Sequence, residues 1–139
     1  MKLEFTAHEI GAETDKGVVT AWLRAKGWNE QSLHGLMLMR MTGEHDDEAD
    51  DDVYLEIPIQ RFVATGGITK ATLSPTNLRI QLNEQSQRAF GGYGELHIQI
   101  MSPPSELAEL RDGLRVVFRE CAFYSESGFG GKEAQSSGL

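Results

Sequence analysis

Short stretches in which apolar and polar residues alternate recur along most of the chain, and they restrict its fold more than any other feature. Leu3, Phe5 and Ala7 alternate with polar residues, and the same period of two returns at residues 53–57, 78–82 and 96–100. Side chains of a strand point alternately to its two faces, so these segments predict strands with one buried face. Residues 36–41 form a short, mostly apolar run that is typical of a strand covered on both faces.

Turn signals separate these strands. Asp15-Lys16-Gly17 predicts a tight turn that joins the opening strand to a second strand at residues 18–24. Ser74-Pro75-Thr76-Asn77 predicts a second turn, between strands at residues 68–73 and 78–82. The sequence therefore indicates hairpins, which are antiparallel pairs.

A single long helical pattern follows the last of these strands. Two prolines and Glu106 mark its start, and one apolar stripe runs along it, formed by Leu107, Leu110, Leu114, Val117 and Phe118. Gly113 costs this helix about 1 kcal/mol relative to alanine, so burial has to stabilise it. We expect an α+β fold, with a mainly antiparallel sheet of about six to seven strands and one long C-terminal helix packed on one face.

The 139 residues are enough for one domain with its own core. We place a single α+β domain at residues 1–122 and a polar, Gly/Ser-rich C-terminal tail at residues 123–139, expected to be mobile. Trp22 and Trp28 are expected to contribute to packing.

The negative charge is concentrated in one segment. Lysine and arginine number 13 against 21 acids, a net charge of −8, and residues 44–52 alone hold seven of those acids and no base. Without this segment the chain is close to neutral. Such a balance argues against a protein that coats nucleic acid, because phosphate binding needs a basic surface.

The sequence also bears on compartment. Cys121 is the single cysteine, so no disulfide forms within the chain. Glu4, His8 and Glu9 interrupt the stretch that a signal peptide would need to be apolar, and no window approaches a membrane span. We expect a cytoplasmic protein that does not bind membranes.

No motif of catalysis or metal binding is complete. The four histidines lie far apart in the sequence, and an EF-hand starting at Asp46 would have Asp51 and Ile57 where it needs glycine and a bidentate acid. Residues 91–94 are glycine-rich but lack the ending of a phosphate loop. We therefore expect no enzyme, no catalytic residue, no metal and no cofactor.

Several short segments together resemble the immunity protein 10 family. They are F-T-A-H-E-I-G-A-E near the start, L-M-L-M-R, Y-L-E-I, G-G-I-T-K-A-T-L-S with N-L-R-I-Q-L, E-L-H-I-Q-I, and finally L-A-E-L-R-D-G-L-R-V-V-F. The resemblance extends over residues 3–118 and rests on the order and spacing of these segments. The family comprises small α+β proteins encoded beside bacterial polymorphic toxins, so the resemblance implies that the partner is a cognate toxin.

An immunity protein needs a contact surface rather than a catalytic group. If the toxin is a nuclease, its substrate groove is basic, and an acidic loop is suited to bind there. The hypothesis places the toxin contact on the acids of residues 44–52, with two tyrosines and a glutamate as further contacts: Glu44, Asp46, Asp47, Glu48, Asp50, Asp51, Asp52, Tyr54, Glu56 and Tyr93.

Three questions stay open on sequence alone. The first is whether the toxin is bound at its active site or at an exosite, and the second is whether the chain is a monomer or a homodimer. The third is the function class, because a cytosolic module that binds a small ligand or has a regulatory role is the alternative reading. An enclosed apolar pocket with a few polar groups would favour that alternative.

Overall fold

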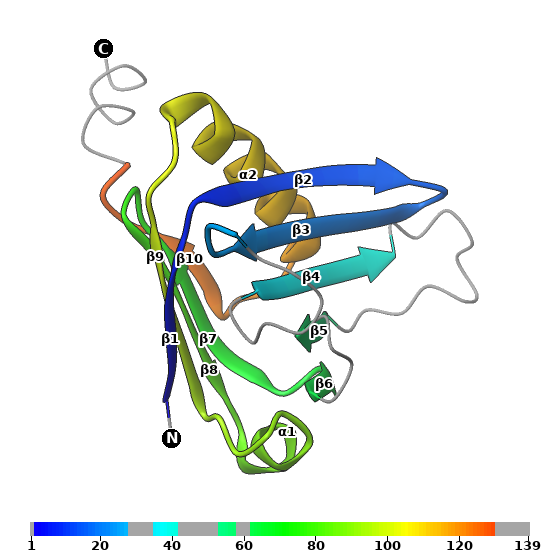
Figure 1. Ribbon diagram of the computed structural model, residues 1–139. Coiled ribbons are helices and arrows are strands. Elements are labelled where there is room, and N and C mark those ends of the chain that lie inside the picture. Colours follow the sequence, from blue (N-terminus) through cyan, green and yellow to red (C-terminus); the bar gives the residue numbers. More distant parts are fainter. Residues whose placement is uncertain (1, 28–34, 42–52, 58–61, 130–139) are drawn as a thin grey trace.

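The computed structural model describes residues 2–27, 35–41, 53–57 and 62–129. Over these residues the fold is α+β, with ten strands in two five-stranded sheets and two helices (Figure 1). The elements are β1 (Lys2–Ala7), β2 (Glu9–Asp15), β3 (Val18–Arg24), β4 (Gly35–Met41), β5 (Tyr54–Ile57), β6 (Phe62–Thr65), β7 (Ile68–Leu73), β8 (Asn77–Leu82), α1 (Glu84–Ala89), β9 (Glu95–Ile100), α2 (Pro104–Val117) and β10 (Tyr124–Glu126). The predicted class is confirmed, but the single sheet of six to seven strands is wrong.

One sheet is an antiparallel meander in the order β2-β3-β4-β5-β6, here called the meander sheet. The turn predicted at residues 15–17 joins β2 to β3, and its Lys16 and Gly17 have φ values of 52° and 80°. Positive φ at both central residues matches the right-handed twist of a hairpin. The first strand of this hairpin is β2 rather than the opening strand, because the chain leaves β1 at His8 and enters a different sheet.

The other sheet has the order β1-β9-β8-β7-β10, here called the mixed sheet. Its inner pairs are antiparallel, whereas the edge strands β1 and β10 run parallel to their neighbours. The hairpin predicted at residues 68–82 is confirmed as β7 and β8. Its turn is closed by the Ser74 N–H, which donates to the Asn77 carbonyl oxygen at 2.8 Å.

Buried side chains from both sheets and α2 form one apolar cluster. The alternation is clearest in β3, where Val19, Ala21 and Leu23 are buried and the residues between them are half-buried. These buried residues face α2, which lies across β2, β3 and β4 (Figure 1). The meander sheet therefore has one covered face and one face that points away from the helix.

Helix α2 confirms the predicted apolar stripe. Leu110, Leu114 and Val117 are buried, and Phe118 is buried just after the helix ends. Close packing requires glycine at position 113, because a Cβ there would collide with the Cβ of Ala12 in β2. The glycine that weakens the isolated helix lets α2 lie close against the meander sheet.

The short helix α1 was not predicted. Its N-terminus is capped by Asn83, whose side-chain oxygen accepts a hydrogen bond from the Ser86 N–H at 2.9 Å. Gly91 and Gly92 follow with positive φ values of 68° and 85°, and the chain then enters β9. Asparagine before an acidic residue was the sequence signal for this helix.

Helix α2 is not the last element of the fold. Residues 124–126 form β10, which pairs in parallel with β7, although these residues lie in the segment 123–139 that was expected to be a polar tail. The Phe123 carbonyl oxygen accepts from the Ala71 N–H at 3.0 Å, and the Ser127 N–H donates to the Leu73 carbonyl oxygen at 2.9 Å. Strand pairing thus extends the fold beyond residue 122; residues 130–139 lie outside the described part of the chain.

Candidate interaction surface

The face of the meander sheet that points away from α2, here called the outer meander face, brings together residues from five strands. Strand register places Trp22 between Gly11 and Met37, and Met37 opposite Glu56. The next row runs from Glu13 through Thr20 and Met39 to Tyr54 by the same pairings. Its central residues are Gly11, Glu13, Thr20, Trp22, Met37, Met39, Tyr54, Glu56, Val63 and Thr65.

Large apolar side chains occupy the middle of this face. Trp22, Met37, Met39, Tyr54 and Val63 are all half-buried, and Met41 at the end of β4 is 36% exposed. Gly11 makes room for the indole of Trp22, since a Cβ at Gly11 would lie 2.6 Å from Trp22 Cζ2. The tryptophan therefore lies against the backbone of β2 and leaves part of its ring open to solvent.

Acids predominate among the charges of this face. Its strand positions carry Glu9, Glu13 and Asp15 on β2 and Glu56 on β5, against one base, Arg24 on β3. The guanidinium carbon of Arg24 lies 5.8 Å from the centre of the Trp22 ring, within the range of a cation–π contact. The outer meander face is thus apolar in its centre and mainly negative around it.

Tyr54 and Glu56 lie side by side on this face, as their spacing predicts. The Tyr54 hydroxyl donates a hydrogen bond to Glu56 Oε1 at 3.2 Å. Partial burial raises the pKa of Tyr54 above 10.0, and the charge and hydrogen bond of Glu56 raise it further. Tyr54 therefore stays a neutral donor at physiological pH, and the pair presents a fixed aromatic ring beside a carboxylate.

Tyr93 lies elsewhere. It belongs to the loop between α1 and β9. Its ring packs edge to face against the ring of Phe62 on β6, with the centroids 6.0 Å apart. Phe62 pairs with the buried Ile57, so it lies on the opposite side of the meander sheet from Tyr54 and Glu56. The structure does not bring Tyr93 together with the other two residues, and its role as a toxin contact stays a prediction.

The seven acids of residues 44–52 lie outside the described residues, so their position stays a prediction as well. The chain leaves β4 at Met41 and returns at Tyr54, and these two strands are antiparallel neighbours. The connection between the strands thus starts and ends at one end of the meander sheet. Tyr54, on the outer meander face, is only two residues from Asp52.

Sequence reasoning missed Trp22, Met37, Met39 and Glu13 as members of one surface. Trp22 has the same phase along β3 as Thr20 and Arg24, which was a signal that it points away from the core. Met37 and Met39 gave no such signal, because they alternate with Leu36 and Leu38 in an uninterrupted apolar run. Only pairing with β3 and β5 shows that the methionines share a face with polar residues.

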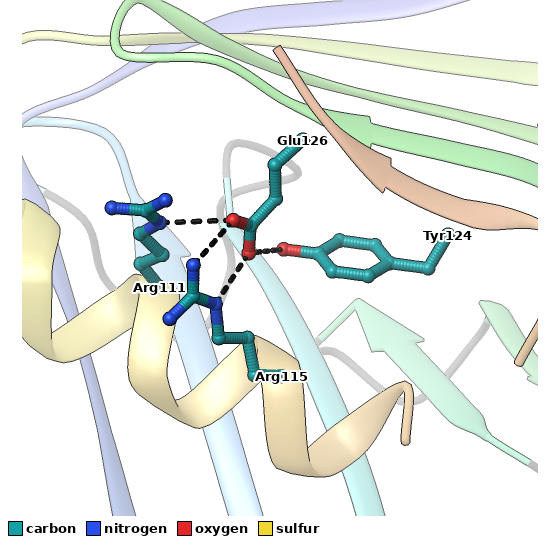
Figure 2. A network of polar contacts seen from close by, with 4 residues as sticks. All are labelled: Arg111, Arg115, Tyr124 and Glu126. Carbon is teal, nitrogen blue, oxygen red and sulfur yellow. Dashed lines mark hydrogen bonds and ion pairs between the residues drawn. The ribbon is translucent and has the colours of Figure 1, made fainter. Parts of the chain in front are cut away.

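A second polar cluster connects the mixed sheet to α2 (Figure 2). Glu126 on β10 accepts hydrogen bonds from Arg111 at 3.0 Å, from Arg115 at 2.9 and 2.8 Å, and from the Tyr124 hydroxyl at 2.8 Å. Burial alone would raise the pKa of Glu126, but the bonds from Arg115, Tyr124 and Arg111 outweigh it and lower the pKa from 4.5 to about 2. Glu126 on β10 thus binds two arginines of α2, and the cluster acts as a structural clamp between the strand and the helix.

Arg40 contacts the other end of α2. This buried side chain, on β4, donates through one Nη atom to the carbonyl oxygens of Val117 at 3.1 Å and Arg119 at 2.7 Å. Carbonyl groups at a helix C-terminus lack partners within the helix and carry partial negative charge, so a buried cation stabilises them. Cys121 lies 3.4 Å from the same nitrogen, consistent with a packing role for the thiol.

Within residues 2–27, 35–41, 53–57 and 62–129 no group of three or more His, Cys, Asp or Glu side chains is placed to hold a metal ion. His97 on β9 lies 3.6 Å from Glu4 and accepts from Arg79 at 3.5 Å, so it belongs to the polar side of the mixed sheet. Nor does any helix within these ranges have the length and apolarity needed to cross a membrane.

Two surface hollows bear on the small-ligand alternative. One, of about 350 Å³, lies between α2 and the β2–β3 end of the meander sheet and is lined in part by Glu13, Glu109 and Asp112. The other, of about 190 Å³, lies on the outside of the mixed sheet among residues such as Lys70, Arg79 and Glu95. Neither is an enclosed apolar pocket, so neither favours that alternative.

Comparison with known proteins identifies the family. The family described as Immunity protein 10 matches residues 6–108, which is well over half of the chain. The match extends from the end of β1 into α2 and includes every strand of the meander sheet. No curated protein matches. Immunity proteins bind a cognate toxin and are generally not enzymes. This chain belongs to the Immunity protein 10 family.

Proposed function

We propose that this protein neutralises the toxin of a bacterial polymorphic toxin system by binding it in the cytoplasm. The observation that carries the proposal is the family match over residues 6–108. Inhibition by binding requires a surface that occupies the toxin's active site or a neighbouring exosite. The half-buried aromatic and methionine side chains of the outer meander face supply a surface of the composition found at protein interfaces.

The acids of residues 44–52 are proposed as a contact that speeds association. They hold seven negative charges within nine residues, beside Tyr54 and Glu56 in the sequence. A toxin with a basic substrate groove, such as a nuclease, would attract this segment at long range. Complementary charges raise association rate constants to about 10⁸–10⁹ M⁻¹s⁻¹ at low salt, which suits an inhibitor that has to act before damage occurs.

The test begins with the toxin encoded beside the gene for this chain. Coexpression of the intact chain should protect cells from that toxin. Replacing the seven acids by Asn and Gln should lower the association rate constant about tenfold or more at low salt and flatten its salt dependence. A control variant neutralises three exposed acids outside this segment, Glu4, Glu84 and Glu120, and the change in rate constant is compared per charge removed.

The two parts of the proposal fail separately. An unchanged rate constant and salt dependence would reject the acidic segment as a contact while leaving the immunity function in place. If the neighbouring gene encodes no toxin and coexpression protects against nothing, the immunity function itself is rejected.

A further inference from the structure

We infer that the outer meander face is the surface on which the toxin docks, and that the matching toxin surface carries an apolar patch surrounded by lysine and arginine side chains. The inference rests on the proposed function and adds where the toxin binds and what chemistry it presents. It uses only strand residues that the structure describes and is independent of the acids of residues 44–52.

The first support is the composition of the face. Trp22 and Met37 are direct cross-strand neighbours, as are Met39 and Tyr54, so the large side chains form one continuous patch rather than scattered residues. Aromatic residues and methionine are enriched in the buried centre of protein interfaces. Methionine also adapts its unbranched side chain to the shape of a partner. The patch is therefore suited to pack against an apolar patch on a partner protein.

The second support is the contrast with the outward face of the mixed sheet. There the polar side chains bind one another: Lys2 lies 3.7 Å from Glu95, Thr6 donates to Gln99 at 3.3 Å, and Thr72 lies 3.3 Å from Ser125. The outward face of the mixed sheet is therefore a polar surface suited to contact with water. The outer meander face departs from it with five half-buried apolar or aromatic side chains.

The third support is charge. Four acids and one base occupy the strand positions of the outer meander face. Two copies meeting through this face about a twofold axis would bring the same acids together, which opposes a homodimer here. Nucleic acid and anionic lipid are repelled for the same reason. A basic rim on the toxin would pair with Glu13 and Glu56, so the charge favours a cationic protein surface.

The fourth support is that the two aromatic side chains of the face are already held in place. Trp22 is held between Gly11 and Arg24, and Tyr54 is hydrogen-bonded to Glu56. Strands spaced about 4.8 Å apart make the five-stranded face about 19 Å wide, which is enough for the centre of an interface of ordinary size. Side chains fixed before binding lose little conformational entropy when the partner arrives.

Methionine oxidation tests the location directly on the intact chain. Met39 and Met41 lie on the outer meander face, whereas Met101 lies outside it at the end of β9 and is 61% exposed. Hydrogen peroxide converts accessible methionine to its sulfoxide. Binding of the toxin encoded by the neighbouring gene should slow oxidation of Met39 and Met41 several-fold and leave that of Met101 unchanged, as followed by mass spectrometry.

Two charge-matched variants test the energetics. Met39→Lys introduces a cation into the centre of the face and should weaken toxin binding about tenfold or more. Gln81→Lys introduces the same charge on the outward face of the mixed sheet, where Gln81 is exposed, and should leave affinity within about twofold. Isothermal titration calorimetry gives both dissociation constants, and circular dichroism verifies that both variants are folded.

Each outcome decides between the two proposals. A toxin complex that forms while Met39 and Met41 oxidise at their free rates overturns the docking face and leaves the proposed function standing. Failure of the intact chain to bind or protect overturns the proposed function, and the docking face with it. Protection of these methionines that depends on chain concentration without toxin, with a dimer in sedimentation equilibrium, would assign the face to a second copy and overturn the inference.

Discussion

The outward faces of the two sheets differ although both consist of neighbouring strands from one short chain. On the mixed sheet, charged and hydroxyl side chains cover the surface and bond one another, as Lys2 does with Glu95. On the meander sheet, Trp22, Met37 and Met39 lie half-buried in the same kind of position. Sheet architecture alone therefore does not determine how a face meets water. The outward face of the mixed sheet is a solvated surface, whereas covering the outer meander face with a partner would remove apolar area from water, which is favourable.

The two sheets also meet α2 differently. The meander sheet packs directly against the helix, so closely that Gly113 and Ala12 leave no room for an added Cβ. The mixed sheet reaches the helix through β10, where Glu126 binds Arg111 and Arg115. The contact at Gly113 is made by apolar groups, whereas the contact at Glu126 depends on the ionisation of one carboxyl group.

The largest effect is expected from a pair of neighbours in β4. Leu38 is fully buried and faces α2, so Leu38→Ala should lower the free energy of unfolding by about 3 kcal/mol. Met39 lies on the outer meander face and is half-buried, so Met39→Ala should cost about 1 kcal/mol or less. Urea denaturation measures both. Equal losses would show that the two faces of the meander sheet are covered alike.

The next effect concerns the close contact of α2 with β2. At an exposed helix position, replacing glycine by alanine raises the free energy of unfolding by about 1 kcal/mol. At Gly113, however, the added Cβ would collide with Ala12. We expect Gly113→Ala to lower the free energy of unfolding by about 2 kcal/mol, because α2 has to move away from the sheet. Ala108→Gly, at an exposed position of α2, measures the difference in helix propensity between alanine and glycine without a packing contribution. A stabilised Gly113→Ala variant would contradict the close packing.

The smallest of the three effects concerns the clamp on the mixed sheet. The pKa of Glu126 is about 2 in the folded chain against 4.5 as a reference, so its ionisation stabilises the fold above about pH 4.5, and this contribution is lost as pH falls towards 2. Glu126→Gln should cost about 1–2 kcal/mol at pH 7, an amount reduced by solvent because half of the Arg115 side chain is exposed.

The difference between wild type and Glu126→Gln should therefore shrink between pH 4.5 and pH 2, as urea denaturation at several pH values can follow. Glu109→Gln, at an exposed glutamate of α2, serves as the control. A difference that stays constant over this range would show that the carboxylate of Glu126 is not what holds β10 to the helix.

Local patterns were sufficient for much of the fold. The turn at residues 15–17, the β7–β8 hairpin and the buried stripe of α2 each depend on residues close in sequence, and each was predicted. The number of sheets was not predictable in this way. His8 alone separates β1 from β2, and no local pattern shows that the strands on either side of it pair with distant and different partners.

The candidate surface was likewise predictable from the sequence only in part. That Tyr54 and Glu56 share a face follows from their spacing of two, so the sequence by itself determined this pair. Whether Glu13, Trp22 and Met39 join them depends on register among strands that lie far apart in the chain, and the tertiary structure alone decided that. Alternation determines which residues of one strand point the same way. Only hydrogen-bonded pairing determines which strands lie side by side, and a binding surface needs both.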